Sequence, residues 1–238
     1  MKKLPTMVIL AGGFGTRLQK LTENIPKSMV KINDKPFIYH QLSLLKKNKI
    51  EDIIICTGHL SEKIEEYVGN GARFELNVKY SNDGKKLLGT GGAIKKVSET
   101  IDGPFFVLYG DSYLDICYED VYDFYISNNN KALMSIIENN NKWDKSNILY
   151  RNNEIVSYKK KHDEAKMRHI DYGLSIFEKD HLKNFRKNEN FDLTLLYEYL
   201  LNKKELIAFE VFKRFYEIGS LTGINDLSLY LKNSGEAI

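Results

Sequence analysis

The sequence predicts an α/β fold, with a mixed, mostly parallel sheet and helices on both faces of the sheet. In the first half of the chain, short apolar segments typical of buried strands alternate with segments that have the pattern of helices. Alternation of this kind is typical of a parallel sheet covered by helices. The second half has strand-like segments with little helix between them, which indicates that the sheet is mixed.

In the first half, strands are expected at residues 7–10, 52–57, 77–80 and 105–109, and helices at 37–49, 61–68 and 92–100. Ser61 is a candidate helix cap, and Gly69 is a candidate stop for the same helix. Ligands of open parallel sheets bind at the carboxyl ends of strands. The loops after Leu10 and Tyr80, and Asp111 after the fourth strand, are therefore expected at one edge.

In the second half, strands are expected at residues 132–138, 146–150, 154–159, 170–177 and 206–211, and helices at 191–202 and 221–234. We find no internal repeat and no linker, and 238 residues can form one domain with a sizeable core. We therefore expect a single domain over residues 1–238, with one functional lobe at 1–130 and a second at 131–238.

Composition narrows the function classes. The net charge is +3, and basic residues are scattered apart from Lys159, Lys160 and Lys161, so no nucleic-acid partner is expected. Cys56 and Cys117 lack metal-site spacing and are expected to be buried thiols in a reducing cytosol. No segment has the length of a signal peptide or a membrane span, which predicts a cytoplasmic protein without a membrane partner. The Asn runs at 128–130 and 139–141 are expected to be loop filler.

The most informative segment is a glycine loop that directly follows the first apolar strand. It reads Leu10-Ala11-Gly12-Gly13-Phe14-Gly15-Thr16-Arg17, and Lys27 follows ten residues later. Glycines let backbone N–H groups approach phosphate oxygens, and the two basic side chains add positive charge. The loop lacks the ending of a Walker A motif and the third glycine of a dinucleotide fingerprint. It predicts a site for a nucleoside triphosphate; the alternative is a tight strand-to-helix turn.

Three motifs resemble the signature of the sugar-phosphate nucleotidylyltransferases. They are the glycine loop through Leu18, the segment Pro26-Lys27-Ser28-Met29-Val30, and Lys35-Pro36-Phe37. The resemblance implies a Rossmann-like, GT-A-like fold whose first lobe binds the nucleotide and whose second lobe binds an acceptor. It also implies a reaction that joins the nucleotide to a phosphorylated small molecule and releases pyrophosphate. It is strongest to short bacterial members for capsule and lipopolysaccharide precursors, such as heptose-1-phosphate guanylyltransferases and phosphoglutamine cytidylyltransferases. Ser28 stands where the family usually has proline.

The same resemblance implies roles for individual residues. Arg17 would hold the β- and γ-phosphates, and Lys27 would stabilise charge at the α-phosphate. Asp111 and Glu217 would bind Mg²⁺, with Mn²⁺ as an alternative ion; Glu217 stands where the family has aspartate, and glutamate is an acceptable ligand. The residues expected to contact the nucleotide are Leu10, Ala11, Gly12, Gly13, Gly15, Thr16, Gly89, Thr90 and Gly91. For the last three, a glycine-rich helix entry is the alternative.

Lys161, Asp171 and Tyr172 are expected to bind the acceptor, Lys161 through its phosphate. Asp171 departs from the family's usual asparagine; a carboxylate accepts hydrogen bonds from hydroxyls and can also pair with an ammonium group. The first expectation is a sugar 1-phosphate acceptor. The alternatives are a CTP-dependent transfer to phosphoglutamine or phosphocholine, and a non-catalytic nucleotide-binding module. The base, a role of Trp143 as lid or hairpin anchor, and assembly into a homo-oligomer are left open.

Overall fold

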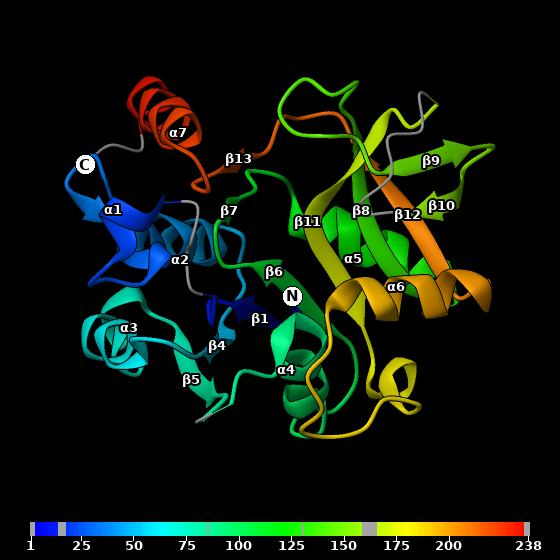
Figure 1. Ribbon diagram of the computed structural model, residues 1–238, viewed down its shortest axis with the longest axis horizontal. Helices are drawn as coiled ribbons and strands as arrows, with labels where there is room; N and C mark the ends of the chain where they lie inside the picture. The colour runs from blue at the N-terminus through cyan, green and yellow to red at the C-terminus, as the bar shows by residue number, and fades with distance from the viewer. Residues whose placement is uncertain (1–2, 14–17, 85, 130, 159–165, 236–238) are drawn as a thin grey trace. The chain divides into compact units, whose positions relative to one another are not determined.

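The computed structural model describes residues 3–13, 18–84, 86–129, 131–158 and 166–235. The chain divides into two compact units that are interleaved along the sequence (Figure 1). Unit 1 comprises Met1–Leu87, Leu108–Asp115 and Phe215–Ile238, and unit 2 comprises Leu88–Val107 and Ile116–Arg214. This division differs from the expected boundary at residue 130, because the carboxyl-terminal segment belongs with the amino-terminal one.

Unit 1 begins with strand β1 and ends with helix α7. Its strands are β1 (Thr6–Leu10), β2 (Lys31–Ile32), β3 (Lys35–Pro36), β4 (Asp52–Thr57), β5 (Asn77–Asn82), β7 (Ser112–Tyr113) and β13 (Tyr216–Glu217). Its α-helices are α1 (Gln19–Thr22), α2 (Phe37–Lys47), α3 (Ser61–Val68) and α7 (Leu221–Asn233), and its 3₁₀-helices are η2 (Lys27–Met29) and η3 (Ala72–Phe74).

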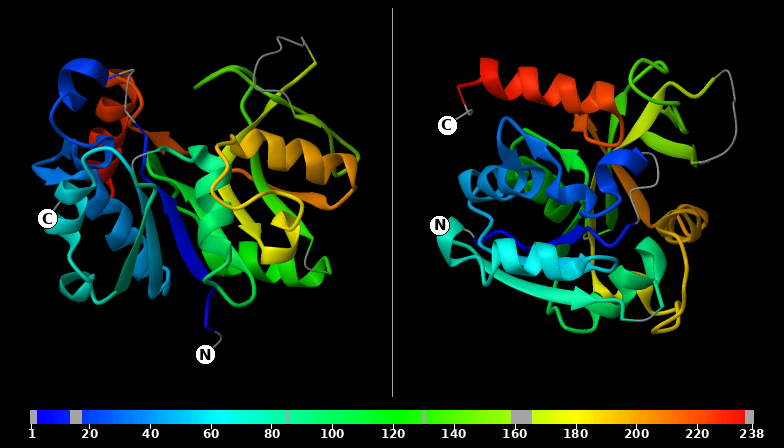
Figure 2. Two further views of the ribbon diagram at one scale, coloured as in Figure 1. Left: turned by 60° about the horizontal axis from the view of Figure 1, so that its bottom comes forward. Right: turned by 60° about the vertical axis from the view of Figure 1, so that its left-hand side comes forward.

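Three parallel strands organise unit 1. β1 pairs with β4, and β4 pairs with β5, both in parallel. The apolar run Ile53-Ile54-Ile55 has the branched side chains that favour a buried strand. Helix α7 lies beside α2 (Figure 2), and their apolar faces share a core cluster with Tyr113 of β7 and Ile218. These two anchors place the short strands β7 and β13, which pair antiparallel.

Unit 2 contains a mixed sheet. Its helices are α4 (Gly89–Ser98), α5 (Tyr118–Ser127) and α6 (Leu193–Asn202), with the 3₁₀-helix η4 (Lys179–Leu182). Its strands are β8 (Ala132–Glu138), β9 (Ile148–Arg151), β10 (Glu154–Tyr158), β11 (His169–Phe177) and β12 (Leu206–Val211). Strand β6 (Phe105–Tyr109) begins in unit 2 and ends in unit 1. β8 pairs antiparallel with β11 and parallel with β12. Helices α5 and α6 cover opposite faces of this sheet (Figure 1).

The α/β fold and the predicted strands are confirmed, with small shifts at their ends. Helix α5 was not expected, and α4 begins three residues earlier than expected. Ser61 is not the cap of α3, because it is the first residue of the helix. Leu60 occupies the cap position, and no side chain caps the helix there. Ser61 Oγ instead accepts a hydrogen bond from Asn82 Nδ2 at 2.8 Å. Cys56 is buried as expected, but Cys117 is exposed, which corrects the expectation of two buried thiols.

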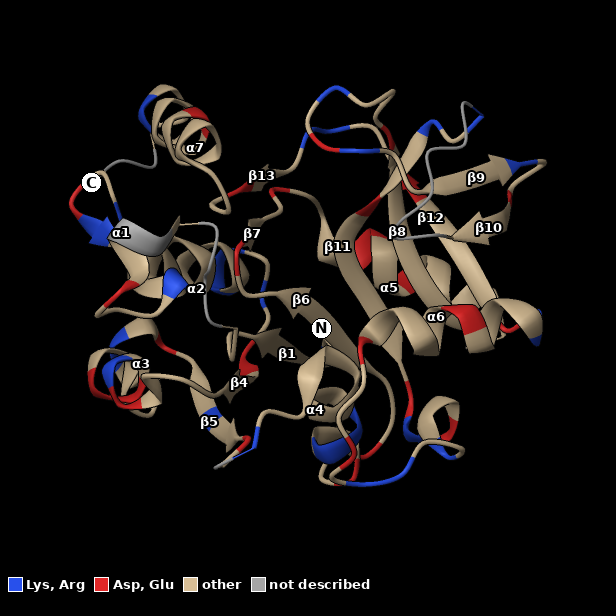
Figure 3. Cartoon of the chain, viewed as in Figure 1, with Lys and Arg blue, Asp and Glu red and all other residues tan. Residues whose placement is uncertain are grey.

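Charged residues are distributed differently on two of the strands and on one of the helices of the fold. Strands β1 and β6 carry no charged residue, while α3 carries both signs (Figure 3). In the described part of the chain, no helix is both long and apolar enough to cross a membrane. The expectation that the Asn run at 139–141 is filler is wrong for Asn139, whose side chain is buried. Its amide donates to Asp144 O at 2.6 Å and thereby shapes the loop that carries Trp143.

Candidate active site

The centre of the candidate site is an ion pair between two residues that are distant in the sequence. Lys27 Nζ donates to Asp111 Oδ2 at 2.5 Å, and the two side chains are 16% and 28% exposed. Lys27 is the first residue of η2, a single turn preceded by Pro26. Asp111 follows Gly110 at the carboxyl end of β6, where ligands of α/β sheets bind.

Glu217 reaches the same place through the pairing of β13 with β7. Glu217 lies opposite Ser112, the residue after Asp111, and Ile218 N–H donates to Asp111 O at 3.0 Å. The Glu217 carboxylate is itself held, since Gly219 N–H donates to Oε2, and Ser220 Oγ, 3.1 Å away, donates to Oε1.

Gly219 lies beside both the lysine and the second carboxylate. A Cβ added at Gly219 would lie 2.3 Å from Glu217 Oε2 and 3.0 Å from Lys27 Nζ. The ammonium and the Glu217 carboxylate therefore lie around the same bare backbone position. Three expected site residues, Lys27, Asp111 and Glu217, are thus brought together within unit 1.

Gln41 supports this arrangement and was missed in the sequence. Its Nε2 donates to Tyr109 O at 3.1 Å and to Ser112 O at 2.9 Å, the carbonyls on either side of Gly110 and Asp111. Gln41 is 1% exposed. The only available signal was a polar residue on an otherwise apolar face of α2, and that pattern does not say what the residue binds.

The start of the glycine loop packs against the same turn. Gly110 N–H donates to Leu10 O at 3.1 Å, and Ala11 N–H donates to Cys56 O at 2.9 Å. A Cβ at Gly110 would lie 2.4 Å from Leu10 O, so this position must be glycine. Gly13 differs, because a Cβ there would meet no described atom within 4 Å. The described residues therefore leave this backbone position uncovered, which suits the approach of a ligand.

The second glycine cluster, in unit 2, is used by the chain itself. Gly91 N–H donates to Phe191 O at 3.0 Å, and a Cβ on Gly91 would lie 2.3 Å from the Phe191 ring. Thr90 Oγ1 accepts from Leu193 N–H at 2.8 Å, and a Cβ on Gly89 would lie 2.6 Å from Phe191 O. Packing of the residue 191 segment is therefore enough to explain these glycines. Contact of Gly89, Thr90 and Gly91 with a nucleotide stays a prediction.

Two of the expected acceptor residues, Asp171 and Tyr172, lie on β11 of unit 2. Asp171 Oδ1 accepts from Gly173 N–H at 2.9 Å, at an irregularity in the pairing of β11 with β8. Tyr172 is 1% exposed, so its burial favours a packing role over acceptor contact. Burial and then the negative charge of Asp171 raise the pKa of the Tyr158 hydroxyl.

Several expected site residues lie outside the described residues. They are Gly15, Thr16 and Arg17 of the glycine loop and Lys161 of the acceptor group. Two cations lie near the Trp143 ring, Lys142 Nζ at 5.0 Å and the Arg214 guanidinium at 5.4 Å from its centroid. His169 Nε2 lies 3.0 Å from Glu210 Oε1.

The paired carboxylates fit a magnesium ion. Mg²⁺ usually takes one or two protein carboxylates and completes its shell with water and substrate phosphates. Asp111 and Glu217 supply that number, and a cationic ammonium, that of Lys27, already pairs with Asp111. Within the described ranges no group of three or more His, Cys, Asp or Glu side chains gathers, so a site built only from protein ligands is not found there.

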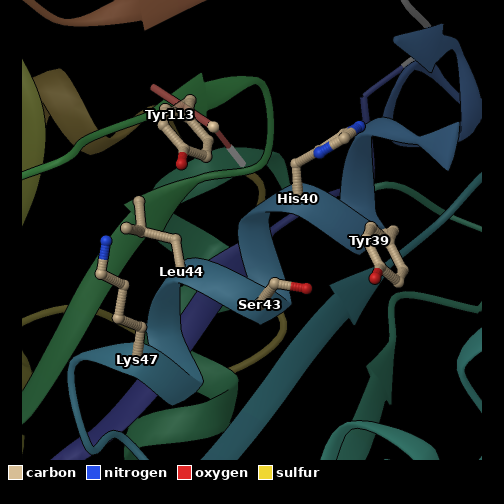
Figure 4. Close-up of a pocket in the computed structure, with 7 residues that line it drawn as sticks. Tyr39, His40, Ser43, Leu44, Lys47 and Tyr113 are labelled. Carbon is tan, nitrogen blue, oxygen red and sulfur yellow. The ribbon is translucent and has the colours of Figure 1, made fainter. Parts of the chain in front are cut away.

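A cavity of about 340 Å³ lies elsewhere on unit 1, against α2 and Tyr113. Figure 4 shows its lining, in which the amino group of Lys47 and the hydroxyl of Ser43 point away from each other. Polar groups of a binding site converge on the ligand. None of the expected site residues lines this cavity, and we do not place the active site there.

The fold and the lysine–carboxylate site define an α/β protein with its candidate site at the carboxyl end of β6. The chain belongs to the nucleotidyl transferase family, whose pattern it matches over residues 6–227. This confirms the family indicated by the glycine loop and the lysine segment.

Curated relatives are similar over part of their length. The chain is 41% identical over 109 residues to the D-glycero-α-D-manno-heptose 1-phosphate guanylyltransferase of Campylobacter jejuni, covering 46% of this chain and 48% of that protein. It is 38% identical over 120 residues to the UTP–glucose-1-phosphate uridylyltransferase of Synechocystis, covering 46% and 31%. The aligned part therefore spans about half or less of these relatives.

Solved structures are similar over nearly the whole chain. HddC from Yersinia pseudotuberculosis, complexed with GMP-PN, has a TM-score of 0.80 at 25% identity, covering 96% of this chain and 100% of that one. The inositol-1-phosphate CTP transferase of T. maritima has a TM-score of 0.80 at 18% identity, covering 97% of each chain. The second likeness shows the shared fold.

Proposed function

We propose that this protein is a nucleotidylyltransferase that transfers a nucleoside monophosphate from an NTP to a sugar 1-phosphate and releases pyrophosphate. The observation that carries the proposal is the meeting of Lys27, Asp111 and Glu217 beside the bare backbone of Gly219. One cation and two carboxylates at strand ends are the groups that phosphoryl chemistry requires. Family membership over residues 6–227 supports the reaction class.

The reaction needs little covalent help from the protein. A phosphate oxygen of the acceptor attacks the α-phosphorus, a new P–O bond forms, and the bond to the β-phosphate oxygen breaks as pyrophosphate leaves with the electron pair. The attacking phosphate is already ionised at neutral pH, so no general base is required. Positioning and neutralisation of charge then supply most of the rate.

The residues divide this work. Asp111 and Glu217 would hold Mg²⁺, which neutralises phosphate charge when bound. The Lys27 ammonium would stabilise charge on the α-phosphate, and the open backbone at Gly13 would face the phosphates. Arg17 on the β- and γ-phosphates and Lys161 on the acceptor phosphate belong to the same proposal.

The acceptor is proposed from the relatives' names. Because the C. jejuni relative is named a heptose 1-phosphate guanylyltransferase and the HddC structure holds GMP-PN, GTP with D-glycero-α-D-manno-heptose 1-phosphate is the first pair to test. A product of this kind would serve capsule or lipopolysaccharide synthesis in the cytoplasm.

A second candidate is a CTP-dependent transfer to a non-sugar phosphate, such as phosphoglutamine or phosphocholine. The fixed carboxylate of Asp171, held by Gly173 N–H, favours it, because a carboxylate can pair with a cationic acceptor group. A non-catalytic nucleotide-binding module is disfavoured, since both carboxylates and the lysine are present.

The test is pyrophosphate release with Mg²⁺, for each of four NTPs against heptose 1-phosphate, glucose 1-phosphate, phosphocholine and phosphoglutamine. Release with one NTP and a sugar 1-phosphate supports the first proposal, and release with CTP and a non-sugar phosphate supports the second. Nucleotide binding without release for any pair, including pairs supplied by a metabolite extract, would indicate a binding module.

A further inference from the structure

We propose that the Lys27 ammonium occupies the cation position of the carboxylate pair, and that Lys27 and the divalent ion exchange places when nucleotide binds. The inference rests on the proposed function, because it concerns the same site. It adds a property of Lys27 that phosphate binding alone does not require: the lysine is withheld from phosphate until a metal replaces it at Asp111.

The first argument is geometric. Lys27 Nζ lies 2.5 Å from Asp111 Oδ2, within the range of a strong charge-assisted hydrogen bond. A Cβ added to Gly219 would lie 3.0 Å from the same nitrogen and 2.3 Å from Glu217 Oε2. The ammonium therefore takes up a carboxylate oxygen that a metal ion would need, at the shared backbone position beside the second carboxylate.

The second argument is electrostatic. A divalent ion bound to Asp111 while the ammonium stayed in place would put like charges a few ångströms apart in a mostly covered site, at a cost that rises as solvent is excluded. The Lys27 side chain is only 16% exposed, so water screens that repulsion poorly. The repulsion therefore favours departure of Lys27 from Asp111 when the ion binds.

The third argument concerns where the ammonium goes. Among the described residues, Asp111 and Glu217 carry one negative charge more than Lys27 neutralises, which attracts a divalent ion. An arriving triphosphate supplies new acceptors for the displaced ammonium, at the phosphate that Lys27 is proposed to stabilise. Metal without nucleotide must separate the ion pair with no such compensation, so the free ion is expected to bind weakly and the ion with nucleotide tightly.

The experiment measures Mn²⁺ binding to the full chain by the loss of the electron paramagnetic resonance signal of the free ion. Lys27→Met removes the ammonium and keeps a side chain of similar length. We expect it to bind Mn²⁺ alone about tenfold or more tightly than the unaltered protein. Lys27→Gln, a second neutral variant, is expected to behave alike, and thermal unfolding checks that each variant is folded.

A second arm adds a non-hydrolysable NTP analogue. The unaltered protein is expected to gain more Mn²⁺ affinity from the nucleotide than Lys27→Met does, because only the former has an ammonium to transfer. The matched control is Lys46→Met. Lys46 is an exposed lysine of α2 that pairs with Glu75, and its variant should behave like the unaltered protein in both arms.

The outcomes separate the exchange from the site. If Asp111→Asn abolishes Mn²⁺ binding but both neutral Lys27 variants bind the free ion no more tightly than the unaltered protein, the exchange is overturned and the metal site stands. If Asp111→Asn and Glu217→Gln leave Mn²⁺ binding unchanged, the metal site is overturned and the exchange with it. Tighter binding by both Lys27 variants, lost in the double variant with Asp111→Asn, supports the exchange.

Discussion

Lys27 Nζ lies 2.5 Å from Asp111 Oδ2, although 84 positions separate the two residues. The first lies in a one-turn helix after the glycine loop and the second at the end of β6. The pair lies at the carboxyl end of a buried strand, which is where ligands of α/β sheets bind. The pair makes both residues testable.

Replacing Lys27 by alanine should reduce the turnover number roughly 10²–10³-fold while the protein stays folded, because a positive group at a developing phosphate charge is worth that much. Pyrophosphate release measures the rate, and circular dichroism measures the fold. Lys46→Ala, which removes an exposed lysine, should leave turnover unchanged. Near-normal turnover of Lys27→Ala would refute the assignment.

Replacing Glu217 by glutamine should raise the Mg²⁺ concentration needed for half-maximal rate about tenfold, since one anionic ligand becomes neutral. The amide oxygen can still accept from Gly219 N–H, and the amide nitrogen can donate to Ser220 Oγ in place of the bond that the carboxylate accepts, so little change in melting temperature is expected. Glu75→Gln, at an exposed position, is the control. An unaltered metal requirement would remove Glu217 from the site.

Two glycine variants separate packing from ligand approach. Gly110→Ala should cost about 1–3 kcal/mol of unfolding free energy by overpacking, since its Cβ would lie 2.4 Å from Leu10 O. In Gly13→Ala the added Cβ would meet no described atom, so the unfolding free energy should stay within about 0.5 kcal/mol of that of the unaltered protein. The Gly13 variant should nevertheless bind nucleotide about tenfold more weakly, or about 1.4 kcal/mol. Urea unfolding and calorimetric titration measure the two effects, and equal nucleotide affinity would show that the backbone at Gly13 does not face the phosphates.

Replacing Gln41 by methionine should lower the unfolding free energy by about 1–3 kcal/mol, because the carbonyls of Tyr109 and Ser112 lose their shared donor. Chemical denaturation checks this loss. Ser28→Ala is a useful contrast: Ser28 Oγ is buried with no hydrogen-bond partner among the described residues, so its removal should be neutral or stabilising. Equal losses in the two variants would contradict the contact-based explanation.

Unit 2 should lose stability in acid through Glu99. Hydrogen bonds from Lys95 and then Lys179 lower the pKa of this carboxyl from 4.5 to about 2. A carboxyl whose pKa is lowered by folding stabilises the folded state at any pH above the pKa that it has in the unfolded chain. This contribution is lost as the pH falls from about 4.5 to about 2. The unfolding midpoint of Glu99→Gln should therefore fall less steeply with acid over that range than that of the unaltered protein. Parallel curves would show that the interaction contributes nothing.

Local sequence patterns predicted most of the strands, because an apolar run of branched residues such as Ile53-Ile54-Ile55 has few alternatives to a buried strand. Helix α5 was missed because its aromatic residues suit strands as well as helices, and its buried positions Tyr118, Val121 and Tyr125 are recognised only with the packing in hand. Local patterns do not encode the tertiary contacts that decide such cases.

The candidate site divides in the same way. Lys27, Asp111 and Glu217 were predicted from motifs, and the structure brings them together. Gln41 could not be predicted, because its two acceptors are backbone carbonyls 68 and 71 positions away, which carry no side-chain signature. The second glycine cluster shows the opposite limit, since its sequence did not reveal that Phe191 would fill the space beside Gly91.

The interleaving of the two units has a consequence for how the protein is made. The chain passes between units at positions 87–88, 107–108, 115–116 and 214–215, and β13 reaches its partner β7 only after the whole of unit 2 has been synthesised. A growing chain on the ribosome therefore holds Lys27 and Asp111 long before Glu217 exists. Its reactive centre stays incomplete until late in translation, so an unfinished chain would lack one of its two proposed metal ligands.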